Sequence, residues 1–121
     1  MNTHRRGARG ESIAARHLLR DGYRIITQNF KSRRGEVDIV CEKDRFLVFV
    51  EVKAWRSLGI EELGRAIDCR KRRRIVNAAR VFLGQHREYE DTLIRFDVVF
   101  VHPDAETSEH IEGAFDGECR E

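Results

Sequence analysis

The sequence predicts an α/β protein, in which helical and extended segments alternate along a chain of 121 residues. Apolar residues recur at helical spacing over residues 8–21 and 61–83. Runs rich in Val, Ile and Phe, which favour a pleated surface, fill residues 23–30, 36–53 and 93–101. Helices and strands therefore share one chain of the size of a single domain.

The composition fits a globular protein, with 40% hydrophobic and 36% charged residues, and a net charge of only +2 that says little about partners. We expect residues 1–121 to form one domain with a flexible basic N-terminus and a charged C-terminal tail. The sequence has no apolar run of transmembrane length and no signal-peptide core, so we expect no membrane association. Cys41, Cys69 and Cys119 lack metal-finger spacing, which favours free thiols in a cytoplasmic protein.

The first helix is expected over residues 8–21, and Gly22 is placed to end it. Glu11 falls inside the apolar stripe of this helix, next to Ala15 and Leu18, and not on its solvent-facing side. Two interpretations of Glu11 remain open. It is either an acid favoured by the positive end of the helix dipole or a functional acid turned toward the sheet.

The central feature is a hairpin over residues 35–53, GEVDIVCEKDRFLVFVEVK, in which charges interrupt apolar strands. Asp38 lies within the first strand, and Glu51 and Lys53 end the second. Because side chains two residues apart share a face of a sheet, Glu51 and Lys53 point the same way. A Glu-x-Lys at a strand end is usually a solvated edge or an ion pair. The additional acid inside an apolar run favours a functional site, since a buried carboxylate without a partner is costly.

The position of Asp38 relative to Glu51 depends on the turn. If the turn is centred on residues 43–44, Asp38 pairs with Phe49 and Glu36 pairs with Glu51. Asp38 and Glu51 then share a face as diagonal neighbours, roughly 7–8 Å apart between backbones. A three- or five-residue turn would put the two acids on opposite faces. Converging carboxylates repel unless a cation lies between them, and their hard oxygen atoms suit Mg²⁺ or Mn²⁺.

The second helix is expected over residues 61–83 and is strongly basic. Lys71 falls on its apolar stripe, four residues from both Ile67 and Ile75. Lys71 either extends along the apolar face to reach solvent, or belongs to a phosphate-binding helix and reaches the site of the hairpin. The neighbouring basic residues that project elsewhere or lie at the edge of the stripe are Arg70, Arg72, Arg73 and Arg74.

Two further features fall outside the hairpin. Trp55 and Arg56 could stack on nucleic-acid bases, or serve as core packing or a lid. The run over residues 93–101 is almost continuously apolar, as expected of a strand buried on both faces. Asp97 within it is interpreted as a structural residue that pairs with Arg95 or a loop donor. A weak element is expected near residues 111–115.

This order of elements and charges resembles the PD-(D/E)xK nuclease superfamily and, more closely, the YraN-like family of bacterial proteins, which are similar to archaeal Holliday junction resolvases. The resemblance covers about residues 9–101. It rests on Gly10-Glu11, Ala14, Gly22-Tyr23, Asn29, Gly35-Glu36-Val37-Asp38, Phe49-Val50-Glu51-Val52-Lys53, Lys71, Arg74, Ala78-Ala79 and Arg95-Phe96-Asp97-Val98-Val99.

The resemblance implies a restriction-endonuclease-like fold, with a mixed central β-sheet flanked by helices. It implies that Asp38 and Glu51 bind Mg²⁺ or Mn²⁺, that Lys53 is the catalytic lysine, and that Glu11 is an additional acid. Lys71 and Glu36 would support the site. The nucleic-acid-binding residues would be Arg33, Arg34, Arg70, Arg72, Arg73 and Arg74.

The implied activity is metal-dependent hydrolysis of phosphodiester bonds in structured or branched DNA. Two alternatives are a nucleic-acid-binding module without catalysis and a protein-interaction domain that uses the basic helix. A homodimer is compatible with each of these interpretations. Salt-dependent DNA binding would distinguish the nuclease and the binding module from the protein-interaction domain. Metal-dependent cleavage would distinguish the nuclease from the binding module.

Overall fold

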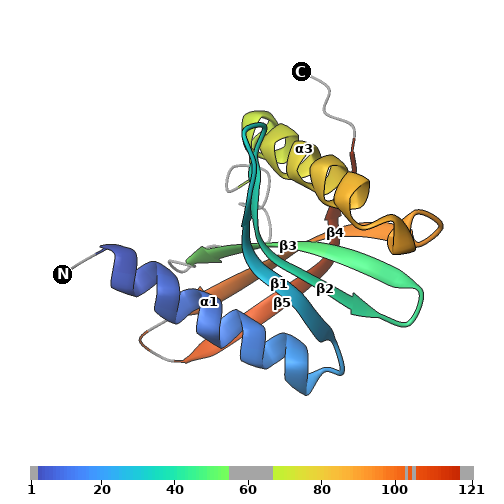
Figure 1. The fold of residues 1–121 in the computed structure, drawn as a ribbon. Helices are drawn as coiled ribbons and strands as arrows, with labels where there is room; N and C mark the ends of the chain where they lie inside the picture. Colours follow the sequence, from blue (N-terminus) through green and yellow to red (C-terminus); the bar gives the residue numbers. More distant parts are fainter. Residues whose placement is uncertain (1–2, 55–66, 103, 105, 118–121) are drawn as a thin grey trace.

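A computed structural model describes residues 3–54, 67–102, 104 and 106–117 of the chain (Figure 1). Trp55 and Arg56, for which base stacking, core packing and a lid were considered, lie outside the described residues. The same holds for residues 61–66, the start of the expected second helix. The described part contains these elements, in order: α1 (Thr3–Arg20), β1 (Arg24–Lys31), β2 (Glu36–Lys43), β3 (Phe46–Ala54), α3 (Cys69–Gln85), the short 3-10 helix η2 (Arg87–Tyr89), β4 (Leu93–His102) and β5 (Thr107–Phe115).

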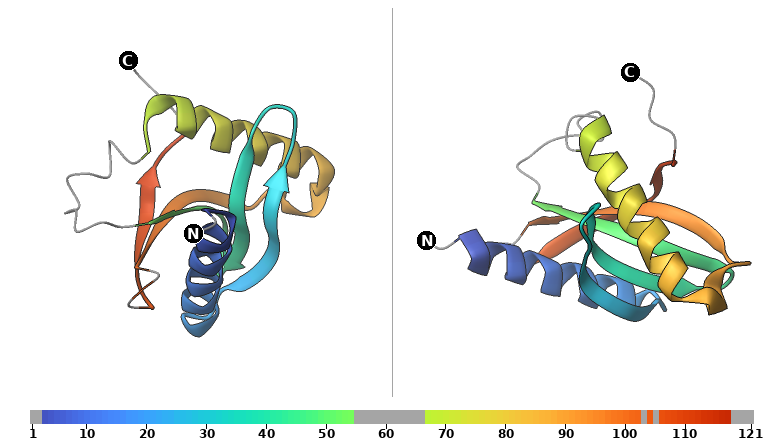
Figure 2. Two further views of the ribbon diagram at one scale, coloured as in Figure 1. Left: turned by 90° about the vertical axis from the view of Figure 1, so that its left-hand side faces the viewer. Right: turned by 45° about the horizontal axis from the view of Figure 1, so that its top comes forward.

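The five strands form one mixed sheet in the order β1-β2-β3-β4-β5. Strands β3 and β4 are parallel, and the other neighbours are antiparallel. The chain between the parallel pair includes α3, which serves as the crossover that parallel strands require. Figure 2 shows α1 and α3 on opposite sides of the sheet. The predicted α/β fold, a mixed sheet flanked by helices, is therefore confirmed.

Both edge strands of the sheet are irregular. The pairing of β1 with β2 shifts between Ile25 and Thr27, and Asn29 in β1 has a positive φ of 55°. The pairing of β5 with β4 shifts between Phe96 and Val98, and Gly113 in β5 has a φ of 58°. A shift of this kind bends the strand and increases its twist.

Helix α1 begins at Thr3, five residues before the expected start, and it ends where the sequence predicts. Gly22 adopts a φ of 91°, and the amide of Tyr23 donates to the carbonyl of Leu18 at 3.0 Å, which closes the helix end. One face of α1 is buried against the sheet. This layer contains Ile13, Ala14, Ala15, Leu18, Ile39, Cys41, Val48, Val50, Val99 and Val101.

Helix α3 begins at Cys69, later than the expected residue 61. Asp68 caps this start, because its carboxylate accepts a hydrogen bond from the amide of Lys71 at 2.9 Å. The apolar face of α3 packs on the side of the sheet opposite α1. The residues buried there include Val37, Val40, Leu47, Phe49, Ile75, Val76, Ala78, Ala79, Phe82 and Phe96.

The loop between β1 and β2 lies directly against α3. A Cβ atom added to Gly35 would meet the carbonyl oxygen of Arg74 at 1.9 Å, so this position accepts only glycine. The contact brings the loop residues Arg33 and Arg34 beside the basic helix. Two segments far apart in the sequence therefore present arginines in one region.

The expectation of three free thiols is wrong. Cys41 is a free, buried thiol, whereas Cys69 is disulfide-bonded. Sequence spacing did not reveal this bond because disulfide formation depends on the distance between Cα atoms in the folded chain. In the described part of the chain, no helix is long and apolar enough to cross a membrane.

Candidate functional site

The turn between β2 and β3 sets the register of the central hairpin. Lys43 pairs with Phe46 and Val40 pairs with Phe49, so the turn is at Asp44-Arg45. The expected pairing of Asp38 with Phe49 is therefore wrong by two residues. Asp44 adopts a left-handed φ of 56°, which suits a two-residue turn at this position. Because the difference is an even number of residues, Asp38 and Glu51 still share a face of the sheet.

Asp38 and Glu51 form a carboxyl pair on the face covered by α3. The observed register, continued by one residue pair beyond Ile39 and Val50, places Asp38 opposite Glu51. Glu51 is buried, with 5% of its surface exposed, and Asp38 is partly buried. One carboxyl oxygen of Asp38, Oδ2, accepts a hydrogen bond from the amide of Val52 at 2.8 Å. The backbone of β3 thus fixes the orientation of Asp38.

The surroundings of Asp38 favour its protonated form. Burial, followed by a hydrogen bond and charge repulsion from Glu51, raises the pKa of Asp38 to about 8. The amide of Val52 and the charge of Lys71 act in the opposite direction and do not offset this rise. Asp38 therefore keeps its proton at neutral pH in the metal-free protein.

Two lysines complete the acid–lysine cluster, which we define as Asp38, Glu51, Lys53 and Lys71. The Nζ atom of Lys71 lies 3.2 Å from Oε2 of Glu51, so of the two alternatives for Lys71 the one in which its side chain reaches the hairpin is observed. Burial opposes the charge on Lys71, but Glu51 and a hydrogen bond with Lys53 raise its pKa. For Lys53, burial and the neighbouring Lys71 lower the pKa. The pKa values of the two lysines are therefore shifted in opposite directions.

Glu36 and Glu11 are two further residues that the sequence predicts for the site. Glu36 is exposed at the start of β2, where it pairs with Lys31 of β1. Glu11 is partly buried on α1, the helix that covers the other face of the sheet. The roles of Glu36 and Glu11 stay predictions.

The predicted nucleic-acid-binding arginines form a mostly exposed surface beside the cluster. The exposed members are Arg33, Arg34, Arg70, Arg73 and Arg74. Arg72 differs and was expected to face solvent or substrate. Its Nε donates to the carbonyl of Ile67 at 2.9 Å, and its guanidinium lies 5.7 Å from the ring centre of Phe115. Arg72 therefore joins α3 to β5 and is only partly exposed.

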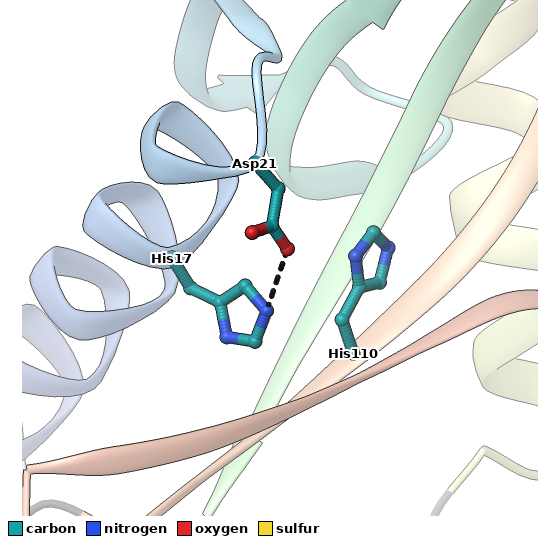
Figure 3. Close-up of side chains that lie close together, drawn as sticks. All are labelled: His17, Asp21 and His110. Carbon is teal, nitrogen blue, oxygen red and sulfur yellow. Dashed lines mark ion pairs between the residues drawn. The ribbon is translucent and has the colours of Figure 1, made fainter.

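A second polar cluster was not found by sequence reasoning. His17 and Asp21 at the end of α1 lie close to His110 of β5 (Figure 3). His17 and Asp21 are four residues apart, so on a helix they are neighbours, and this spacing could have indicated the pair from the sequence. His110 is distant in the sequence, and only the pairing of β5 with β4 brings it to this place.

The predicted structural role of Asp97 is confirmed in the same region. Its carboxylate accepts two hydrogen bonds from Arg95, both at 2.8 Å, and one from the amide of Gly113 at 2.9 Å. Burial alone would raise the pKa of Asp97, but the hydrogen bonds from His110, Arg95 and Gly113 together lower it. Asp97 is therefore a buried carboxylate whose hydrogen bonds favour its charged form.

Comparison with known proteins identifies relatives over most of the chain. The profile of "Uncharacterised protein family UPF0102" matches residues 10–101. The UPF0102 protein RPA0323 of Rhodopseudomonas palustris is 39% identical over 112 residues, which cover 93% of this chain and 84% of that protein. A UPF0102 protein of Treponema pallidum is 43% identical over 98 residues, covering 81% of this chain and 78% of that protein. Among solved structures, an XisH family protein from Nostoc punctiforme is similar, with a TM-score of 0.41, 14% identity, and coverage of 85% of this chain and 98% of that chain.

Proposed function

The chain belongs to the UPF0102 family, and from that premise and the geometry of its acid–lysine cluster we propose that it is a nuclease. It would hydrolyse phosphodiester bonds in structured or branched DNA with Mg²⁺ or Mn²⁺. The observation that carries the proposal is the pairing of two carboxyl groups, one buried and one partly buried, with two lysines on one face of the sheet. The resemblance to PD-(D/E)xK nucleases assigns metal binding, catalysis and support of the site to these same four residues.

The carboxyl pair fits a hard divalent cation. Without a cation, burial and the proximity of Glu51 leave Asp38 protonated. A divalent ion would displace that proton, because its positive charge offsets the negative charges of both carboxylates. Asp38 and Glu51 would hold the ion. When bound, Mg²⁺ or Mn²⁺ supplies a Lewis acid that stabilises negative charge developing on the phosphate.

The two lysines would have separate tasks. Lys53 has a lowered pKa, which suits a group that orients the attacking water and exchanges a proton with it. Lys71 is ion-paired with Glu51 and would hold that carboxylate in position. Once a phosphate enters, both ammonium groups lie where they can offset its charge.

The arginines on α3 and on the loop before β2 would bind the DNA backbone. Their guanidinium groups suit phosphate, and the contact of Gly35 with Arg74 places the two segments together. A polyanionic substrate explains why basic residues gather here although the net charge of the chain is small. The relatives named above are bacterial, and we expect this protein to act in the cytoplasm, where bacterial DNA lies.

The test is a cleavage assay with Mg²⁺ and with Mn²⁺ on duplex, flap and four-way-junction DNA. We expect the wild type to cleave at least one substrate, and Asp38→Asn to abolish cleavage while DNA binding is kept or strengthened. The substitution removes a metal ligand, whereas in the metal-free protein the protonated Asp38 is already neutral, so asparagine adds no charge that would oppose DNA binding. Asp44→Asn is the matched control, since Asp44 is exposed in the turn and outside the cluster.

Each other outcome assigns a different function. DNA binding without cleavage under all these conditions would favour a catalytically silent binding module. Absence of salt-dependent DNA binding would favour a protein-interaction domain. Cleavage by Asp38→Asn at the wild-type rate would show that Asp38 is not a metal ligand.

A further inference from the structure

The cluster of His17, Asp21 and His110 has the donor atoms of a transition-metal site. One ring nitrogen from each histidine and one carboxylate oxygen all lie within 4.8 Å of one another. Figure 3 shows the three side chains turned toward a common space between α1 and β5. Two imidazoles and one carboxylate are ligands that suit Zn²⁺, which prefers nitrogen donors more than Mg²⁺ does.

A contact with Asp97 fixes the orientation of the His110 ring. Its Nε2 lies 2.6 Å from Oδ2 of Asp97, and the two side chains are only 7% and 0% exposed. Because a carboxylate only accepts, His110 donates from Nε2, and its Nδ1 is left with a lone pair. A histidine ligand whose second nitrogen donates to a carboxylate is a common arrangement in zinc sites.

Asp97 can serve as this partner because it is itself held in place. Arg95 and the amide of Gly113 donate to the same carboxylate, so Asp97 cannot turn away from His110. Asp97 is therefore occupied by these donors, and Asp21 supplies the carboxylate of the site. Asp21 is about half exposed, and its side chain is free to adjust to an ion.

His17 has a similar arrangement on the helix side. Its Nδ1 lies 2.6 Å from Oγ of Ser108, and its Nε2 lies 3.1 Å from Oδ2 of Asp21. Two ligand atoms of a tetrahedral zinc ion are roughly 3.3–3.5 Å apart, because each is about 2.0–2.2 Å from the metal. The pair His17 and Asp21 is therefore already near the spacing that zinc requires.

We propose that His17, Asp21 and His110 bind one Zn²⁺ ion, with the fourth position open to water. The ion would join the end of α1 to the edge strand β5. This site is separate from the acid–lysine cluster, because His110 pairs with Val99, which faces α1, whereas Glu51 faces α3. The proposal therefore goes beyond the nuclease activity and does not depend on it.

The experiment titrates the metal-free full-length protein with Zn²⁺ in competition with a coloured chelator. We expect one Zn²⁺ per chain in the wild type, and Asp21→Asn and His17→Gln should each weaken binding by roughly tenfold or more. Both substituted side chains are accessible enough for the fold to persist, which circular dichroism would check. Replacement of Zn²⁺ by Co²⁺ should give the visible absorption of a tetrahedral site in the wild type, and this absorption should be weakened in Asp21→Asn and His17→Gln.

A control variant separates this site from the rest of the protein. Asp44→Asn removes an exposed carboxylate elsewhere and should bind Zn²⁺ as the wild type does. At equal concentration, Zn²⁺ should raise the melting temperature of this control more than that of Asp21→Asn. The proposal is overturned if the wild type binds no stoichiometric Zn²⁺, or if Asp21→Asn and His17→Gln bind it with unchanged affinity.

Discussion

At the scale of single residues, the proton on Asp38 links the candidate site to the stability of the protein. A carboxyl group with a folded pKa of about 8, against an ordinary value of 3.8, binds a proton more tightly in the folded chain than in the unfolded chain. The folded state is thus favoured by protonation of Asp38. This contribution is fully present below about pH 4 and is lost as the pH rises through about 8.

We therefore predict that Asp38→Asn flattens the pH dependence of stability in the metal-free protein. Between about pH 4 and pH 8, the wild type should lose the contribution of Asp38 to its free energy of unfolding, whereas asparagine carries no proton to lose. Urea denaturation in the presence of a chelator at several pH values would measure both proteins. An equally steep loss in the variant would assign the pH dependence to other groups.

At the scale of elements, the contact between the β1–β2 loop and α3 depends on the absence of a side chain. The 1.9 Å approach that a Cβ at residue 35 would make is to a backbone atom of Arg74, and a helix backbone cannot move aside as a flexible side chain can. The loop carrying Arg33 and Arg34 must then separate from the helix. The protein would then be less stable, and the basic surface that the loop and the helix share would be disrupted.

Gly35→Ala is predicted to destabilise the protein by about 1–3 kcal/mol or more, which is the usual cost of overpacking. Gly84→Ala is the matched control, since Gly84 lies in α3 with no atom within 4 Å of its added Cβ. That control should be neutral or stabilising by about 0.5–1 kcal/mol, because alanine favours a helix. Urea denaturation of the two variants tests this contrast, and equal stability would contradict the close approach.

The basic face of α3 gives a prediction about salt dependence. Arg70 and Arg73 are exposed, whereas Arg72 has a structural role and would confuse the result. Replacing Arg70 and Arg73 by alanine should weaken DNA binding for all sequences and reduce the salt slope by about 1 for each phosphate that is no longer neutralised. Arg87→Ala is the control, since Arg87 is exposed beyond α3 and pairs with Glu90. An unchanged slope would give the helix another role.

At the scale of the whole molecule, all three apolar clusters share strands of one sheet. Residues of β3 and β4 contribute to the layers against both helices, and β5 packs on a third group that includes Val98 and Phe100. Loss of one layer would expose the other. We therefore predict one cooperative unfolding transition, with coincident urea curves from far-UV and near-UV circular dichroism. Separate transitions would contradict the expectation of a single domain.

Much of the fold could be predicted because the strands carry their own local signal. The predicted run over residues 93–101 matches β4 almost completely, and the central hairpin was placed with the two acids on one face. The register was missed because the left-handed conformation of Asp44 decides the turn, and an aspartate adopts it only in some turns. His110 joins His17 only through the order of strands in the sheet, which no local pattern contains.

Both edge strands of the sheet are irregular, and this protects the protein from edge-to-edge aggregation. Among the described strands, β1 and β5 are the edges along which a neighbouring copy could extend the sheet. The pairing shift and the positive φ of Asn29 twist β1, and Gly113 does the same for β5. A flat intermolecular strand cannot follow either edge over its whole length. In a homodimer of this chain, a continuous sheet across the interface is therefore disfavoured.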